Sequence, residues 1–264
     1  MEQRLENKKI IVTGASSGIG ERIAWHIAKN GGIPILVARS TEKMQKQCNE
    51  IRQTFNSSCY YYTADLTNQD ELLQTTDVLL REHSKIDGLI NNAGMGKFEL
   101  VEEMSLKEVV LMFQLNVLSL MHFTKELLPH FQQNQQAHIV NIGSQAGKIS
   151  TPKSAAYAAT KHAVIGYSNS LRMEVAKDHI YVTTVNLGPV DTNFFAQADP
   201  SGMYQKNVRK YMLNPDHVAR KLMKYLFKRK REINMPWWME IGSKFYHISP
   251  GIMEKLLEKQ FSKK

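Results

Sequence analysis

Short apolar runs alternate along the chain with longer segments in which apolar residues recur at helical spacing. Runs rich in β-branched and aliphatic residues are typical of strands that are buried on both faces of a parallel sheet. Their alternation with helical segments predicts repeated βαβ units. Seven strands are expected, at residues 10–13, 34–38, 59–63, 88–91, 138–142, 180–186 and 232–234.

Residues that cap helices stand where the helical segments begin. Ser, Thr and Asn side chains accept hydrogen bonds from the free amides of a first helical turn. The expected starts are Ser17, Thr41, Asn68, Ser105, Ser154 and Asn214. The 264 residues contain neither an internal repeat nor a low-complexity linker. We therefore expect one α/β domain of the doubly wound Rossmann type over residues 1–264, with a seven-stranded parallel sheet flanked by helices.

Composition agrees with one sizeable domain, since 42% of the residues are hydrophobic. Two cysteines are too few for a disulfide framework, and the polar first nine residues lack an apolar signal core. A reducing, cytoplasmic location is expected. No run approaches the roughly 20 apolar residues that span a bilayer, so the sequence predicts no transmembrane helix. No Cys/His spacing suggests zinc, and no metal is expected.

Candidate chemistry lies in the segment that contains Ser144, Tyr157 and Lys161. On a helix, Tyr157 and Lys161 would lie one turn apart on the same face. An ammonium beside a phenol stabilises the phenolate, so we expect a lowered pKa for Tyr157. A Ser144 hydroxyl at a strand end could then orient a carbonyl for proton transfer. A lone Tyr-x-x-x-Lys pair is common on amphipathic helices, and it acquires meaning only beside further motifs.

Three glycines follow the first predicted strand, at Gly14, Gly18 and Gly20. Gly14 permits a tight turn, Gly18 allows the backbone to approach a pyrophosphate, and Gly20 lets the helix pack closely on the strand. The free amides at the helix start would then face the phosphates. The spacing G-x-x-x-G-x-G differs from the commoner dinucleotide fingerprint G-x-G-x-x-G.

Taken together, these motifs resemble the short-chain dehydrogenase/reductase family. The resemblance also includes Asn-Asn-Ala-Gly at 91–94 and Asn116 in the following helix, and it extends from about residue 8 to about residue 236. It is closest to the hydroxysteroid-dehydrogenase-like branch, which includes many bacterial oxidoreductases. One departure is Leu187, which stands where the family usually has proline. Loss of that fixed φ leaves the expected nicotinamide contacts of Val190 and Thr192 less firmly held.

The resemblance implies a nicotinamide cofactor and a set of site residues. A hydride would pass to a carbonyl carbon while Tyr157 protonates the oxygen, Ser144 orients it, and Lys161 binds the nicotinamide ribose. The backbone carbonyl of Asn116 would hold a water beside Lys161. The implied catalytic residues are Asn116, Ser144, Tyr157 and Lys161. The implied cofactor-binding residues are Gly14, Ser16, Ser17, Gly18, Ile19, Gly20, Arg39, Asp65, Leu66, Asn92, Ala93, Gly94, Tyr157, Lys161, Val190 and Thr192.

Cofactor choice depends on the end of the second predicted strand. An acidic residue there would hold the ribose hydroxyls of NAD, whereas an arginine accommodates the 2′-phosphate of NADP. The chain has Ala38 and Arg39 at this point. Because Arg is the side chain best shaped for phosphate recognition, the sequence favours NADP (NADPH). Asp65 and the backbone of Leu66 are expected near the adenine.

Residues 193–213 are expected to cover the site as a lid. Its apolar side chains would either shape a pocket for a carbonyl or alcohol substrate with an apolar body, or pack the lid onto the domain. These side chains are Phe194, Phe195, Met203, Tyr204, Tyr211 and Met212.

The C-terminal extension, residues 237–264, mixes aromatic residues with lysines in a chain of net charge +9. We expect it to pack within the chain or in a homodimer or homotetramer, with peripheral membrane contact as the less favoured alternative. Nucleic acid is not expected, because no recognised binding motif accompanies the charge. The alternative to an enzyme is a catalytically silent nucleotide-binding sensor or scaffold, which would not need the proton-transfer pair.

Overall fold

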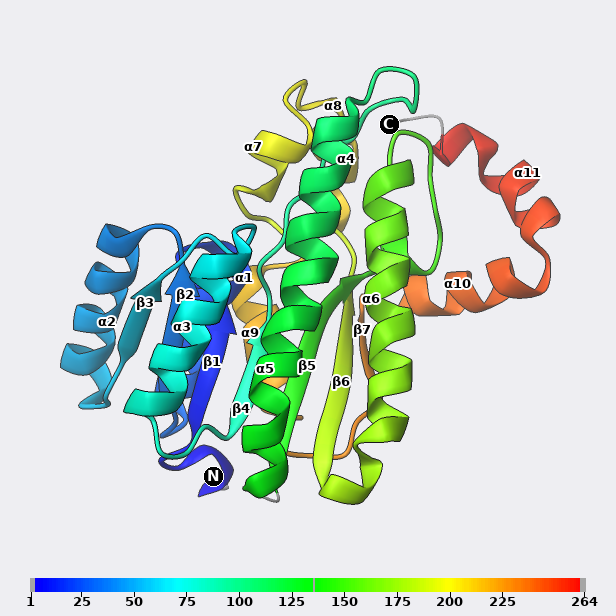
Figure 1. Ribbon diagram of the computed structural model, residues 1–264. Helices are drawn as coiled ribbons and strands as arrows, with labels where there is room; N and C mark the ends of the chain where they lie inside the picture. The colour runs from blue at the N-terminus through cyan, green and yellow to red at the C-terminus, as the bar shows by residue number, and fades with distance from the viewer. Residues whose placement is uncertain (1–2, 135, 262–264) are drawn as a thin grey trace.

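A parallel sheet forms the middle layer of the computed structural model, which describes residues 3–134 and 136–261 (Figure 1). Its seven strands lie in the order β3-β2-β1-β4-β5-β6-β7. The strands are β1 Lys9–Thr13, β2 Ile33–Ala38, β3 Tyr60–Thr63, β4 Gly88–Asn91, β5 Ala137–Ser144, β6 Ile180–Leu187 and β7 Glu232–Met235. The predicted fold class is confirmed, and each strand lies within two residues of its predicted bounds.

Helices cover both faces of the sheet. The longer ones are α1 Gly18–Lys29, α2 Thr41–Phe55, α3 Gln69–Glu82, α4 Leu106–Phe113, α5 Ser119–Gln133, α6 Ala155–Glu174, α9 Pro215–Met223, α10 Trp237–Ile248 and α11 Pro250–Phe261. The apolar side chains of α1, α2 and α9 form one core with the sheet, and those of α3, α5 and α6 form a second core on its other face. Alternate strand residues face opposite cores, which is why these strands are apolar throughout.

The predicted helix starts agree with the structure. Asn68, Ser105 and Asn214 are N-cap residues whose side chains accept amide hydrogen bonds. Ser17 and Ser154 also precede the first residues of helices. The second helix is capped by Ser40, one residue before the predicted start at Thr41.

One helical run is longer and more apolar than the sequence analysis allowed. Leu106–Gln133 comprises α4, the π-helical turn η2 (Gln114–Leu118) and α5. It is 28 residues long, and an 18-residue window within it reaches a mean hydropathy of 1.3. By length and composition it could cross a membrane, so the statement that no stretch approaches this length is wrong. Polar residues interrupt the run, but the mean hydropathy of the window stays within the range of membrane-spanning helices. In this fold Phe123, Leu127 and Phe131 of the run pack into the core.

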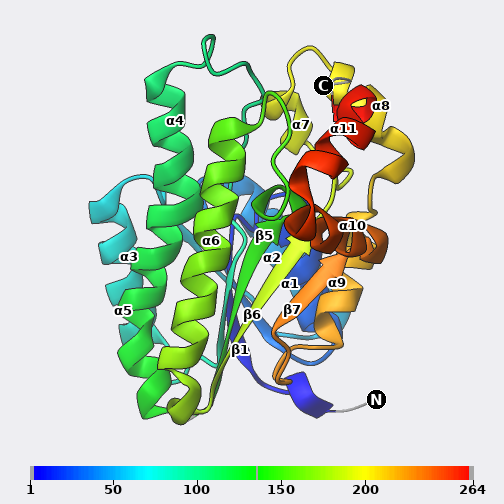
Figure 2. The same cartoon turned by 90° about the vertical axis from the view of Figure 1, so that its right-hand side faces the viewer.

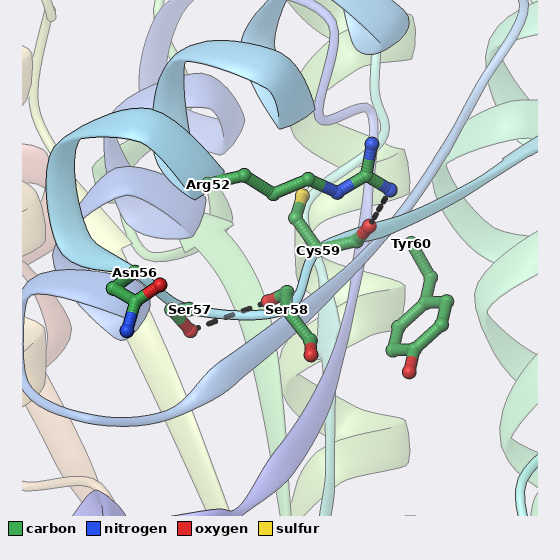
Figure 3. A pocket seen from close by; sticks show the side chains of 6 residues that line it. All are labelled: Arg52, Asn56, Ser57, Ser58, Cys59 and Tyr60. Atoms are coloured by element: carbon green, nitrogen blue, oxygen red, sulfur yellow. Dashed lines mark hydrogen bonds between the residues drawn. The ribbon is translucent and has the colours of Figure 1, made fainter.

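The two cysteines are joined, a pairing that the sequence analysis did not anticipate. A disulfide links Cys48 of α2 to Cys59 immediately before β3, with the Cα atoms 5.2 Å apart. Both residues are buried. A shallow hollow of about 350 Å³ lies next to Cys59 and is lined by Arg52, Asn56, Ser57, Ser58, Cys59 and Tyr60 (Figure 3). Because Tyr60 begins β3, this hollow lies at the amino end of the strand, away from the candidate chemistry.

His138 is a buried polar residue of the central sheet. It is 1% exposed, and its Nδ1 accepts a hydrogen bond from the Phe227 amide at 2.8 Å. Its Nε2 therefore carries the proton and donates to Thr183 Oγ1 at 2.8 Å. Burial lowers the pKa of His138 to about 3. The folded protein keeps this imidazole neutral at a pH where an unfolded chain would protonate it.

Stability should consequently decrease as the pH falls below about 6.5, the unfolded pKa of histidine, because only the unfolded state takes up the proton. His138 alone should contribute a slope of about 1.4 kcal/mol per pH unit between its two pKa values. His138→Asn retains an acceptor but cannot titrate, so urea unfolding between pH 7.5 and 5 should show a shallower slope, with pH values chosen on either side of roughly 6.5. The exposed His217→Asn serves as control, and an unchanged slope in His138→Asn would contradict this account.

Candidate active site

The predicted catalytic residues lie at the carboxyl ends of the central strands. Ser144 is the last residue of β5, and Tyr157 and Lys161 lie on α6. Asn116 lies in η2, where the helix widens into a π-helical turn. Such turns occur frequently at functional sites. The order of the sheet places the crossover between β1 and β4, so the crevice of a doubly wound fold opens beside these residues.

Lys161 is 6% exposed, and its ammonium lies 5.8 Å from the centre of the Tyr157 ring. Its Nζ donates a hydrogen bond to the carbonyl oxygen of Ile142 at 3.0 Å. Ser144 Oγ donates to the Leu187 carbonyl at 3.3 Å and accepts from the Ala146 amide at 3.0 Å. The three side chains therefore gather at the end of β5, each held by a backbone contact or by packing.

The predicted lowering of the Tyr157 pKa is wrong. Burial raises the pKa of Tyr157 to about 12, although a hydrogen bond with Ser144 acts in the opposite direction. Burial also lowers the pKa of Lys161 to about 8. Helical spacing correctly placed the ammonium beside the phenol, but desolvation outweighs their attraction. At neutral pH Tyr157 is thus a protonated phenol that can donate a proton.

Asn116 connects the π-helical turn to the loop after β4. Its Oδ1 accepts from the Met95 amide at 2.8 Å, and its Nδ2 donates to the Met95 carbonyl at 2.8 Å and to Thr160 Oγ1 at 3.0 Å. A Cβ on Gly94 would lie 3.2 Å from Asn116 Oδ1 and 3.7 Å from Lys161 Nζ. The side chain of Asn116 therefore positions the loop beside Lys161.

The glycine-rich turn fits closely against the end of β4. Gly14 has a φ of +62°, and a Cβ there would lie 2.8 Å from Ala93 Cα. A Cβ on Gly20 would lie 2.4 Å from the Gly14 carbonyl and 2.6 Å from Asn92 Nδ2. Thr13 completes the contact, because its Oγ1 accepts from the amides of Asn92 and Ala93 at 2.9 and 3.0 Å.

The start of α1 faces the segment after β6. Gly18, at φ +59°, begins the helix, and a Cβ on it would lie 3.2 Å from Thr192 Cγ2. Ser17 is exposed, and within the described chain its side chain makes no capping hydrogen bond. Ser16 and Ile19 are half-buried neighbours in the same turn. Val190 is buried and forms a bridge with Leu213.

Arg39 and Asp65 lie together at the neighbouring edge. Arg39 is exposed directly after β2, and Asp65 follows β3. Burial tends to raise the pKa of Asp65, but hydrogen bonds from Thr67 and the charge of Arg39 lower it overall. Leu66 is buried beside them. With the close glycine turn and the exposed helix start, these residues fit a dinucleotide extended across the carboxyl edge of the sheet.

Aromatic side chains surround Tyr157 on the lid side. The predicted lid contains α7 Phe194–Ala198, α8 Met203–Val208 and the short turn η5 Arg209–Tyr211. Phe194 lies 5.8 Å from Tyr157 between ring centres, and Phe195 and Tyr204 lie 5.7 Å apart. Met203 and Tyr211 are exposed and Met212 half-buried, so the six predicted pocket residues do not form one cluster.

Phe98 is a site residue that the sequence analysis missed. Its ring lies 5.8 Å from Tyr157, 6.4 Å from Phe194 and 5.0 Å from Tyr204. The Phe98 amide donates to the Ala198 carbonyl at 2.9 Å, which fastens the loop after β4 to the lid. Its place a few residues after the Asn-Asn-Ala-Gly motif was the available signal.

Lys148 was also missed. It follows Ser144 by one short turn, η3 Gln145–Gly147, and its Nζ donates to Glu232 of β7 at 2.6 Å and to Glu240 of α10 at 2.5 Å. A third bond, of 3.2 Å, reaches Asn234 Oδ1. The lysine therefore ties the turn after Ser144 to the edge strand and to the C-terminal extension.

The chain is similar to known proteins over much of its length. The family model described as short chain dehydrogenase matches residues 8–201. Dehydrogenase/reductase SDR family member 7 of Homo sapiens is 36% identical over 196 residues, which cover 73% of this chain and 58% of the human protein. The chain thus spans less than two thirds of that relative.

Two further proteins that are similar to this chain are associated with NADP or NADPH by name. An NADP-dependent 3-hydroxy acid dehydrogenase of Schizosaccharomyces pombe is 33% identical over 193 residues, covering 72% of this chain and 74% of the yeast protein. A short-chain dehydrogenase from Sphingobium yanoikuyae, solved in complex with NADPH, superimposes with a TM-score of 0.79 at 26% identity, covering 92% of this chain and 95% of that chain.

Gly14→Ala should weaken both the fold and nucleotide binding. The substitution places a methyl group 2.8 Å from Ala93 Cα at a φ of +62°, so we expect a loss of about 1 to 3 kcal/mol in unfolding free energy and weaker NADPH binding. Gly166→Ala on α6 is the matched control, because no described atom beyond its chain neighbours and the backbone of its own helix lies within 4 Å of its Cβ position. It should stabilise by up to about 1 kcal/mol. Urea unfolding measures the stability of each variant, and titration with NADPH measures its nucleotide binding. Equal losses in Gly14→Ala and Gly166→Ala would refute the close-packed turn.

Proposed function

This chain belongs to the short-chain dehydrogenase family, and we propose that it is an NADPH-dependent reductase of carbonyl compounds with an apolar body. Members of this family are oxidoreductases of CH–OH and C=O groups. The observation that carries the proposal is the gathering of Tyr157, Ser144 and Lys161 at the carboxyl end of the sheet, next to a group of aromatic side chains. We name this group the aromatic lid cluster; it consists of Phe98, Phe194 and Tyr204. A silent nucleotide binder would need the turn without the proton-transfer pair.

The proposed chemistry is a two-part transfer to the carbonyl group. A reduced nicotinamide, when bound, supplies a hydride to the carbonyl carbon. Ser144 Oγ donates a hydrogen bond that orients the carbonyl oxygen, and the Tyr157 phenol gives that oxygen its proton. The product is an alcohol. Lys161, whose pKa burial lowers to about 8, can return a proton toward Tyr157 near neutral pH.

Residues that would hold the cofactor follow the ends of β1, β2, β3, β4 and β6, and Lys161 joins them from α6. The amides after Ser16 and Ser17 would bind the pyrophosphate, and Lys161 would bind the nicotinamide ribose. Asp65, Leu66 and the segment 92–94 would line the adenosine. Val190 and Thr192 lie opposite the start of α1. Asn116 is a positioning residue through its contacts with Met95 and Thr160.

NADPH is favoured over NADH by Arg39. Arg39 is exposed directly after β2, and its charge helps to lower the pKa of Asp65. Guanidinium groups bind phosphates through charge-assisted, bidentate hydrogen bonds. The NADP-dependent yeast relative and the NADPH complex of the bacterial relative support this preference.

The substrate is proposed to have an apolar body because its neighbours are aromatic. Phe98, Phe194 and Tyr204 lie around the Tyr157 ring and would bind a flat or aliphatic group next to the carbonyl. The homodimer or homotetramer and the cytoplasmic location expected from the sequence stay predictions.

Tyr157→Phe should abolish turnover while NADPH still binds. Only the hydroxyl is removed, so the ring keeps its packing, but the loss of a general acid typically costs about 10²- to 10⁴-fold in rate. NADPH consumption with a panel of ketones, aldehydes and quinones measures turnover, and fluorescence titration measures binding. Tyr167→Phe, on the same helix, should retain activity. Turnover of Tyr157→Phe within a few-fold of wild type would overturn the mechanism, and no turnover by wild type on any panel member would favour the silent binder.

Arg39→Ala should change the nucleotide preference. Losing a charge-assisted phosphate contact costs roughly 1.5 to 3 kcal/mol, or about ten- to a hundredfold in NADPH affinity, whereas NADH affinity should be little changed. Titration of both nucleotides into wild type, Arg39→Ala and the exposed control Arg81→Ala provides the ratio. An unchanged ratio in Arg39→Ala would show that NADPH is selected elsewhere.

A further inference from the structure

The outer side of the C-terminal helices α10 and α11 is apolar and uncovered. We name the tail face by its side chains, which are 44% to 78% exposed: Trp237, Trp238, Ile241, Phe245, Ile248, Ile252 and Leu256. On α10 they recur every three or four residues from Trp238 to Ile248, so they lie along one side of the helix, and Trp237 borders the same side. Figures 1 and 2 show the two helices at the β7 edge of the molecule, with α11 reaching outward from it. These side chains are therefore not buried within the described chain, although Trp238 contacts Tyr211, and of the alternatives expected from the sequence an oligomer contact or a membrane surface remains.

The inner side of α10 fixes the helix to the domain. Glu240 binds Lys148 at 2.5 Å, and Ser243 is buried. A Cβ on Gly188 would lie 2.8 Å from Met239 Sδ, so that side chain packs against the end of β6. The apolar side chains are consequently held outward on an anchored helix.

Basic side chains border the tail face. Lys244 and Lys255 are exposed on the two helices, and Lys206, Arg209 and Lys210 are exposed on the adjoining lid segment. The lid and α10 meet where Tyr211 and Trp238 lie 5.7 Å apart. The acidic residues among the described side chains of α10 and α11 are Glu240 and Glu254. Glu240 pairs with Lys148 and, at 3.9 Å, with Lys244, and Glu254 accepts a hydrogen bond from Tyr246. The border is therefore predominantly positive.

We propose that the tail face lies in the surface of an anionic lipid bilayer. Trp and Phe side chains on one side of a helix, bordered by lysines, are typical of helices that lie in the membrane interface plane. Lysines at such a border also attract anionic headgroups. A second copy of this chain fits less well, because a twofold contact between tail faces would place their like-charged borders together.

Vesicle co-sedimentation of the full chain tests the proposal. The protein should bind phosphatidylcholine vesicles that contain phosphatidylglycerol, and bind less to phosphatidylcholine alone. Binding should weaken as ionic strength rises from about 0.1 to 1 M, where the screening length falls from roughly 10 to 3 Å. Tryptophan emission should also shift to shorter wavelength with anionic vesicles, since Trp237 and Trp238 would leave water.

The variant Phe245→Ser/Ile248→Ser removes two tail-face side chains that are 59% and 78% exposed. It should lose about tenfold or more in vesicle binding while keeping its melting temperature and its NADPH turnover. The matched control is Val101→Ser/Met173→Ser, whose side chains are 76% and 74% exposed and lie outside both the tail face and the apolar run Leu106–Gln133. The control should bind vesicles like the wild type. Lys244→Glu/Lys255→Glu should reduce binding to anionic vesicles.

Three results would overturn the proposal. The first is a wild-type protein that binds neither vesicle. The second is an equal loss of binding in the control variant, which would indicate nonspecific adsorption. The third is a wild-type dimer by light scattering that becomes monomeric in Phe245→Ser/Ile248→Ser, which would assign the tail face to a protein interface. None of these results depends on substrate turnover, so the proposed reductase activity is tested separately.

Discussion

The contact between Thr13 and Asn92 determines how the ends of β1 and β4 meet. Thr13 Oγ1 accepts two backbone amides from the turn after β4, and Asn92 Nδ2 returns a hydrogen bond to the Thr13 carbonyl at 2.9 Å. Hydrogen bonds between adjacent strand ends fix their separation, and buried polar groups that lose such partners are destabilising. The glycine-rich turn must then fit beside the Asn92 amide, which leaves no room for a Cβ on Gly20. Asn92, expected as a cofactor ligand, has a clear structural role in this position.

The parts of the molecule that follow from local patterns were predictable. Strands buried on both faces gave near-continuous apolar runs, and the caps of Asn68, Ser105 and Asn214 gave helix starts. The spacing of Tyr157 and Lys161 also placed the pair correctly. Contacts between distant segments were not predictable: Lys148 meets Glu240 across 92 positions, and Phe98 joins a lid that begins far along the chain. Neither contact produces a periodic pattern of apolar and polar residues in the sequence.

Desolvation explains why the electrostatics of the site were harder to predict than its members. A one-turn spacing fixes the distance between a phenol and an ammonium, but the dielectric around them depends on packing from the whole fold. Here burial raises the pKa of Tyr157 and lowers that of Lys161, which favours the neutral form of each group. The aromatic lid cluster contributes to that burial. Its packing therefore influences the acidity of the site as well as its shape.

The exposure of Arg39 separates two properties of the scaffold. Gly14, Gly20 and Asn92 are confined by backbone atoms, so changes there alter the domain itself. Arg39 lies on the surface after the last residue of β2, and its guanidinium supports no core packing. Substitutions at position 39, by mutation or by design, should therefore have little effect on the free energy of unfolding. The position of Arg39 can therefore change in evolution more freely than the packed positions of Gly14, Gly20 and Asn92.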